Sequence, residues 1–341
     1  MTEAALLEAA RRGDATAYDR LVEPHRGELL AHCYRMLGSF HDAEDALQEA
    51  LVRAWRALPR FEGRSSLRSW LYRIATNACL RALERRPQKL LLPADHGPAA
   101  AGGERVAPSL DDAPWLEPFP DDRLGDAGGD APDARYEQRE SVELAFIAAL
   151  QHLPPRQRAV LILRDVLGFS GGEVAHALET TTASVHSALQ RAHRTVDERL
   201  PARSQQATLR TVDDAALRQS VDAYISAWER SDVDAVAALL TEEATMAMPP
   251  IPTWYAGRDA VVEFLRRGPL APRHGWRLVP VRANAQLAFG HYEWDERRER
   301  FVAHAIQVLT FEGDRIAAIM AFRSPRAFAG FGLPEQLPAA A

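Results

Sequence analysis

One group of side chains in the last third of this 341-residue chain has the residue types to surround a small molecule. These candidate pocket residues are Tyr224, Trp228, Met248, Trp254, His291 and His304. A catalytic histidine needs a paired acid or nucleophile, and the sequence shows neither beside His304. A packed or surface histidine is the simpler interpretation. The sequence therefore predicts a binding site at most, and no enzyme.

Candidates for metal ligands are sparse. His186 and His193 are seven residues apart, two turns along one helix face, without a third ligand nearby. Cys33 and Cys79 are the only cysteines, too few for a disulfide framework or a cysteine-based zinc site. We expect no metal and no cofactor.

A second group is basic. Between Arg60 and Lys89 there are eight basic residues against two acids. Apolar spacing predicts a helix over 67–86 with a core stripe that includes Trp70, which leaves Arg68 and Arg73 on other faces. Nucleic-acid binding and a solvated basic face both fit this pattern. The candidate contacts are Arg60, Arg64, Ser65, Ser66, Arg68, Trp70, Arg73 and Asn77.

A third group follows a short helix, a tight turn and a longer helix. Ser170 and Glu173 have the spacing of a capping box, the turn covers 179–181, and the second helix covers 182–194. This spacing is typical of a helix-turn-helix that reads the major groove, although a structural hairpin remains the alternative. The outer face of the second helix carries Thr182, Ser184, His186, Ser187, Gln190, Arg191 and Arg194.

Changes in composition divide the chain into three parts that are separated by linker segments. Residues 93–135 hold ten acids, three arginines and seven prolines, which is typical of a flexible linker. Its apolar island, Trp115, Leu116 and Phe119, is expected to dock onto another part of the protein. The predicted domains are 1–92, 136–203 and 208–341. No apolar run is long enough for a membrane span and no signal core is present, so a cytoplasmic protein is expected.

The first two domains are predicted to be all-helical, with helices over 3–12, 15–37, 43–58 and 67–86 and Asp42 as the cap of the third. The last domain combines helices over 212–228, 233–240 and 259–267 with later strands. The predicted strands are 244–248, 276–283, 286–294, 301–312 and 315–323. Helices followed by a curved antiparallel sheet indicate an α+β domain.

The helical parts resemble a known family in two long motifs. HDAEDALQEALVRAW at 41–55 and FEGRSSLRSWLYRIATNACL at 61–80 resemble region two of extracytoplasmic-function (ECF) sigma factors. LPPRQRAVL at 153–161, with the helix-turn-helix after it, resembles region four. The resemblance implies core RNA polymerase (β and β′ subunits) and promoter DNA as partners. It also implies that residues 60–77 melt the −10 element of the promoter and that residues 182–194 recognise the −35 element. The acidic helix face implied to bind the β′ clamp helices is Asp42, Asp45, Gln48 and Glu49.

Residues 221–249 and 255–264 resemble the SnoaL-like superfamily, which implies a cone that can hold a small molecule. Tyr224 matches a family tyrosine, but Met248 stands where the proton-abstracting carboxylate belongs, and a thioether cannot accept that proton. The whole chain is similar to ECF sigma factors with C-terminal extensions. We expect the extension to contact the sigma core or linker and to regulate it in cis. A small-molecule sensor, a residual enzyme and an ordinary repressor are the alternatives.

Overall fold

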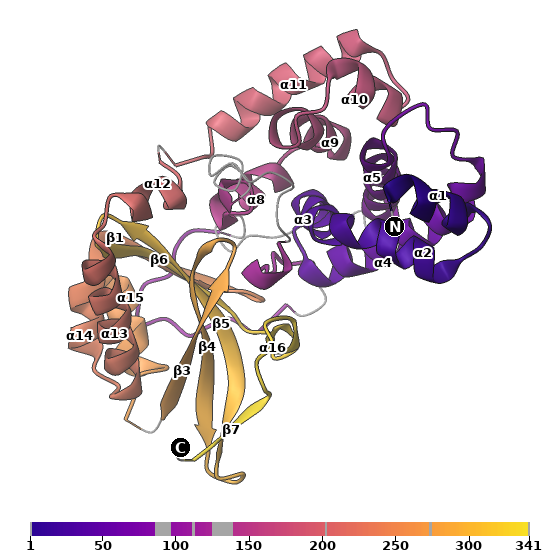
Figure 1. Ribbon diagram of the computed structural model, residues 1–341. Coiled ribbons are helices and arrows are strands. Elements are labelled where there is room, and N and C mark those ends of the chain that lie inside the picture. Colours follow the sequence, from indigo (N-terminus) through magenta and orange to yellow (C-terminus); the bar gives the residue numbers. More distant parts are fainter. Residues whose placement is uncertain are drawn as a thin grey trace. The chain divides into compact units, whose positions relative to one another are not determined.

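The computed structural model describes residues 2–85, 97–110, 113–124, 139–201, 203–272 and 275–339. The chain forms two compact units (Figure 1). The first unit contains Met1–Lys89 and Asp122–Pro201, and the second contains Leu90–Asp121 and Ala202–Ala341. Among the described helices, none has the length and apolarity needed to cross a bilayer.

The first half of the first unit is a helical bundle. Its helices are α1 (Glu3–Arg11), α2 (Ala15–Val22), α3 (Arg26–Leu37), α4 (Phe40–Ala57) and α5 (Leu67–Arg85). The helix expected over 15–37 is two helices, because Pro24 in the 3-10 turn Glu23–His25 has no N–H to continue the ladder. Ser39, not Asp42, caps α4, since its hydroxyl accepts from the Asp42 backbone N–H at 3.1 Å.

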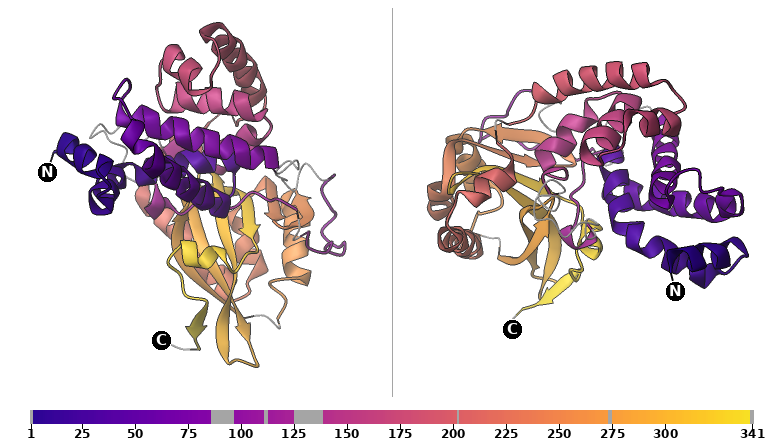
Figure 2. Two further views of the ribbon diagram at one scale, coloured as in Figure 1. Left: turned by 90° about the vertical axis from the view of Figure 1, so that its right-hand side faces the viewer. Right: turned by 45° about the horizontal axis from the view of Figure 1, so that its top comes forward.

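The second half of this unit carries the helix-turn-helix. Its elements are α8 (Leu144–Gln151), α9 (Pro155–Leu161), a π turn (Ile162–Val166), α10 (Gly171–Ala177) and α11 (Thr182–Asp197). The capping box between Ser170 and Glu173 is present as predicted. Figure 2 shows the short α10 before the longer α11.

Two buried arginines join the two halves of the first unit. Arg35 of α3 donates to the Ser141 carbonyl at 3.1 Å and hydroxyl at 2.7 Å. Arg158 of α9 donates to the Met36 carbonyl of α3 and to Gln151 Oε1. Burial lowers the pKa of each guanidinium to about 10, so both stay charged at neutral pH. The predicted domains 1–92 and 136–203 are therefore packed together in one compact unit.

The second unit is a curved sheet with its longer helices on one side and a one-turn helix on the other (Figure 1). The helices are α12 (Gln205–Arg210), α13 (Asp214–Glu229), α14 (Val233–Leu239), α15 (Arg258–Arg267) and α16 (Ala327–Gly330). The strands are β1 (Leu240–Met248), β2 (Ile251–Ala256), β3 (Trp276–Ala283), β4 (Gln286–Asp295), β5 (Arg300–Glu312), β6 (Arg315–Phe322) and β7 (Gln336–Pro338). The strand order is β2-β1-β6-β5-β4-β3, with β7 on β5.

The sheet is mixed, which corrects the expectation of a purely antiparallel one. Strand β1 pairs parallel to β6, whereas the other pairs are antiparallel. The parallel pair arises because β2, α15 and the strands β3 to β5 follow β1 in the chain before β6 returns to lie beside β1. Alternation of apolar residues predicts β1, β3, β4, β5 and β6, but it predicts neither β2 and β7 nor the parallel pairing of β1 with β6.

Candidate functional site

The outer face of α11 is available for contact. Thr181 caps the helix by accepting from the Ser184 N–H at 3.2 Å. Val185, Ala192 and Val196 are buried on the opposite side. All seven side chains predicted to contact DNA from this helix are exposed: Thr182, Ser184, His186, Ser187, Gln190, Arg191 and Arg194.

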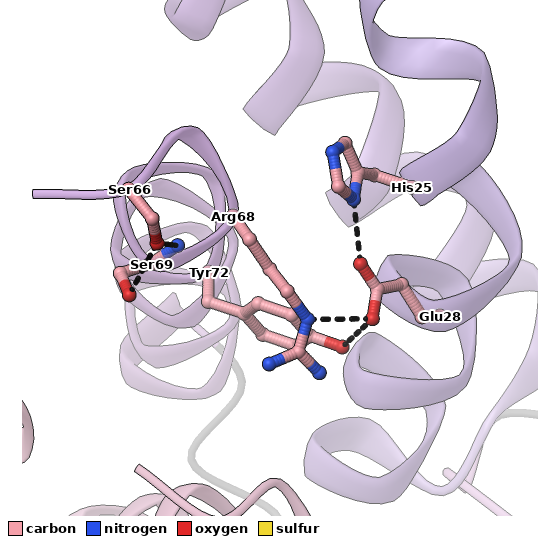
Figure 3. A network of polar contacts seen from close by, with 6 residues as sticks. All are labelled: His25, Glu28, Ser66, Arg68, Ser69 and Tyr72. Carbon is pink, nitrogen blue, oxygen red and sulfur yellow. Dashed lines mark hydrogen bonds and ion pairs between the residues drawn. The ribbon is translucent and has the colours of Figure 1, made fainter. Parts of the chain in front are cut away.

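On α5, the basic group is partly committed to contacts within the protein. Arg68 Nε lies 2.9 Å from Glu28 Oε2 of α3, and the Tyr72 hydroxyl donates to the same oxygen at 3.1 Å (Figure 3). His25 Nδ1 lies 2.7 Å from the other carboxylate oxygen. Burial alone would raise the pKa of Glu28, but the His25 hydrogen bond and Arg68 outweigh it and lower that pKa. Arg68 is therefore held on the bundle by an ionised partner.

Helix α10 packs against this same face of α5. Ser69 donates to Glu173 at 3.4 Å, and Arg73 lies 3.1 Å from His176 Nε2. The Arg68 guanidinium lies 5.4 Å from the ring centroid of Phe169, a cation–π distance. The face predicted to hold −10 DNA is thus partly covered by the helix-turn-helix of the same unit.

The other predicted −10 residues differ in exposure. Arg60, Arg64, Ser65 and Ser66 are exposed, and Asn77 is half-buried. Trp70 is only 7% exposed and packs on Phe61 with ring centroids 4.9 Å apart. Trp70 therefore belongs to the core of the bundle and is the least accessible of the predicted −10 contacts. The end of the basic stretch, 86–89, lies outside the described residues.

The acidic helix face on α4 is divided. Asp45 and Gln48 are exposed, whereas Asp42 and Glu49 are half-buried. Glu49 pairs with Arg53 at 2.5 Å and lies 3.9 Å from Arg81 of α5. The side chains most accessible to a basic partner are therefore Asp45 and Gln48.

A cavity of about 270 Å³ lies within the second unit. Four of the six predicted pocket residues line it: Trp228, Met248, His291 and His304. Tyr224 does not line it but lies behind the wall, where its hydroxyl donates to Gln307 Oε1 at 2.6 Å. Trp254 lies on edge strand β2, with its indole N–H donating to the Gly97 carbonyl at 3.0 Å.

The cavity also contains residues that the sequence did not single out. Glu293 lines it and lies 3.1 Å from His304, the acid partner that sequence analysis did not find. These residues are in different strands, β4 and β5, and a bulge between His291 and Tyr292 sets their register. Sequence alternation alone does not specify which residues of two strands face each other. Four further lining residues that the sequence did not indicate are Val106, Met246, Phe264 and Trp276.

The linker island docks onto the second unit. Trp115, Leu116 and Phe119 are buried there. The Phe119 N–H donates to Asn284 Oδ1 at 2.8 Å, and the Asn284 N–H donates to the Phe119 carbonyl at 2.9 Å. Bridges of Ala100 with Tyr255 and of Pro120 with Ala283 add two further contacts to this docking.

The segment after the helix-turn-helix is fixed to the same unit. Gln205 of α12 donates to the Phe311 carbonyl and accepts from the Phe311 N–H, both at 2.7 Å. Gln206 donates to the Ala285 carbonyl at 2.5 Å. Within the described ranges, no group of three or more acidic, histidine or cysteine side chains is arranged to hold a metal.

A helical bundle, a helix-turn-helix and an α+β cone in this order define a transcription factor of the sigma type. The Sigma-70 region 2 family matches residues 21–87, the Sigma-70 region 4 family matches 143–196, and the SnoaL-like domain family matches 221–319. The ECF RNA polymerase sigma factor SigG of Mycobacterium tuberculosis is 43% identical over 328 residues, 96% of this chain and 86% of that protein. The chain therefore belongs to the ECF RNA polymerase sigma factors, which direct promoter-specific transcription initiation.

A further relative agrees with this assignment, and a solved structure agrees with the fold. The RNA polymerase sigma-H factor of Pseudomonas aeruginosa is 31% identical over 195 residues, 57% of this chain and 92% of that protein. The crystal structure of the Mycobacterium tuberculosis ECF sigma factor SigJ superposes with a TM-score of 0.56 at 23% identity, covering 91% of this chain and 97% of that one. The resemblance stated from the motifs is confirmed, as are the fold class and the partnership with RNA polymerase and promoter DNA.

Proposed function

We propose that the C-terminal SnoaL-like domain regulates the sigma module in cis by holding the chain on both sides of region four. The observation that carries this proposal is the pair of anchors on the second unit. One lies in 97–110 and 113–121 and includes Phe119, and the other is α12 with Gln205 and Gln206. Residues 122–203, which contain region four, are thus tethered at both ends to one domain.

In this proposal α4 binds the β′ clamp helices through Asp45 and Gln48, α5 contacts the −10 element and α11 contacts the −35 element. Acidic groups facing a basic partner set orientation and on-rate more than affinity. The packing of α10 on Arg68, Ser69 and Arg73 supports a closed resting state. Region four must leave α5 before both promoter elements are engaged. The protein acts where RNA polymerase acts, in the cytoplasm.

Release of the docked linker would lengthen the flexible connection between region two and region four, so that region four can move away from α5. While the described parts 97–110 and 113–121 are docked on the domain, they add nothing to the distance that the linker can span. A freed segment of that length adds a root-mean-square span of about 25–30 Å, since a flexible chain spans roughly 5–6 Å times the square root of its residue number. That gain is comparable to one turn of DNA, about 34 Å.

The test is run-off transcription with core RNA polymerase on promoters captured from cells. Phe119→Ser in the full-length chain should release the island and change the rate of open-complex formation several-fold. The matched control is Leu110→Ser, because Leu110 lies in the same segment with its side chain exposed. A chain truncated to 1–207 should change the rate in the same direction. Equal rates for all four proteins would refute regulation in cis.

Enzyme activity in the cone is the competing proposal. The Glu293–His304 pair favours it, because a histidine with a carboxylate partner has the composition of a general base. Turnover of any small molecule by the full-length protein should then disappear in His304→Ala. Regulation in cis instead requires no turnover and is lost with the linker contacts.

A further inference from the structure

The cavity in the second unit has walls and a size suited to a ring compound. Its apolar surface comes from Trp228, Met246, Met248, Phe264 and Trp276. An apolar cavity of roughly 150 Å³ is enough to bind benzene. At about 270 Å³ this cavity has room for two fused rings with a substituent.

His291 supplies an unused polar group on this wall. Its side chain is 1% exposed and lines the cavity, and neither ring nitrogen has a hydrogen-bond partner among the described residues. The ring stands edge-on to Trp228, with centroids 4.7 Å apart and planes at 86°. Burial, with His304 nearby, lowers the pKa of His291 well below its usual range, so the imidazole is neutral with one donor and one acceptor nitrogen. Buried polar atoms are ordinarily hydrogen-bonded, and a ligand hydroxyl can fill this role.

The charged residues that line the cavity are among its more exposed ones. Glu293 and His304 are half-exposed and 3.1 Å from each other, and Arg323 is exposed beyond the end of β6. His291 and Trp228 in contrast are each only 1% exposed. Because burying an unpaired charge is costly, this interior favours an uncharged ligand.

A linker residue completes the cavity. Val106 lines it although it belongs to the segment 97–110, and its side chain is 40% exposed. The chain beside it is held to β2, since the Ala107 N–H donates to Thr253 Oγ1 at 2.9 Å. A ligand in the cavity would therefore touch the segment whose docking controls region four in the proposed function.

We propose that this cavity binds an uncharged one- or two-ring compound bearing a hydroxyl group, with His291 as its hydrogen-bond partner and Val106 packed over it. Bound ligand then adds contacts to the docked linker and stabilises docking by mass action. The binding step stands on the cavity alone, whereas its effect on transcription rests on the proposed function.

The experiment is calorimetric titration of the full-length protein at neutral pH with 2-naphthol, naphthalene and 2-naphthoate as probes. We expect 2-naphthol to bind about tenfold more tightly than the other two. His291→Phe should weaken 2-naphthol about tenfold and leave naphthalene within about threefold, as the loss of one buried hydrogen bond predicts. Tyr292→Phe is the matched control, because Tyr292 follows His291 in β4 and instead donates to the Pro334 carbonyl at 2.9 Å. It should leave all three affinities unchanged.

A second measurement does not depend on a variant. Trypsin cleavage after Arg105, followed by mass spectrometry, reports whether the chain next to Val106 leaves the cavity. Saturating 2-naphthol should slow this cleavage several-fold, while 2-naphthoate at the same concentration should not. Absence of 2-naphthol binding at millimolar concentration, or equal binding to wild type and His291→Phe, would overturn the ligand proposal.

The two proposals fail separately. If 2-naphthol binds as expected but Phe119→Ser and the 1–207 truncation transcribe like wild type, the ligand site stands and regulation in cis fails. If those variants alter transcription but no probe binds, regulation stands and the ligand site fails.

Discussion

Acidification should loosen the bundle of region two through one buried histidine. His32 lies on α3 and is fully buried, with Nε2 at 2.9 Å from the Thr76 hydroxyl. That hydroxyl donates to the Tyr72 carbonyl at 2.7 Å, so it accepts from His32 and places the proton on Nε2. Nδ1 has no partner within the described part of the chain. A second proton there would be a buried charge without a hydrogen bond.

The size of the effect follows from the two protonation equilibria. Burial, aided by Arg35, lowers the pKa of His32 from 6.5 to about 3 in the folded protein. Between these values the unfolded chain binds the extra proton and the folded chain does not, so stability falls as the pH falls below 6.5. Integrating this difference from pH 7 to pH 5 gives a loss of about 2 kcal/mol.

Hydrogen–deuterium exchange read by mass spectrometry can localise this loss. Protection of the α3 amides, corrected for the intrinsic rate, should fall about 30-fold between pH 7 and pH 5, the factor that corresponds to about 2 kcal/mol. His32→Phe keeps a ring of similar shape without the titration, so its α3 protection should change much less over the same range. An equal fall in wild type and His32→Phe would refute the assignment of this pH dependence to His32.

Three further outcomes are expected. Arg191→Ala and Arg194→Ala should each reduce the slope of log affinity against log salt by about 1 in promoter binding, and an unchanged slope would show that α11 makes no phosphate contact there. Ser141→Ala removes a 2.7 Å bond to the buried Arg35 guanidinium and should cost about 1.5–3 kcal/mol, measured by exchange of the α8 amides; unchanged protection would contradict this. Asn284 has a φ of 56°, so Asn284→Ala should be about 1 kcal/mol less stable than Asn284→Gly in thermal unfolding, and equal stabilities would argue against strain.

Local structure was predictable where it depends on neighbouring residues. The strand 276–283 has the bounds predicted from its alternation, and the capping box at Ser170 sits where its spacing placed it. The outer face of α11 is exposed as its polar residues indicate. The errors of this kind are small and have local causes, such as the break at Pro24 and the cap at Ser39.

The two long motifs and the order of the domains also determined the family, because they are properties of the chain itself. Contacts between residues far apart in sequence were decided only by the tertiary structure. Trp70 is buried against Phe61. The irregularity in the β4–β5 register, where His291 stands opposite Ala305 and Tyr292 opposite Ala303, accompanies the contact of Glu293 with His304. The docking of Phe119 on Asn284, 165 residues later, is a contact of the same kind. Periodicity states which face of an element is apolar, but it does not state which surface covers that face, since that choice depends on the shape and packing of the whole domain.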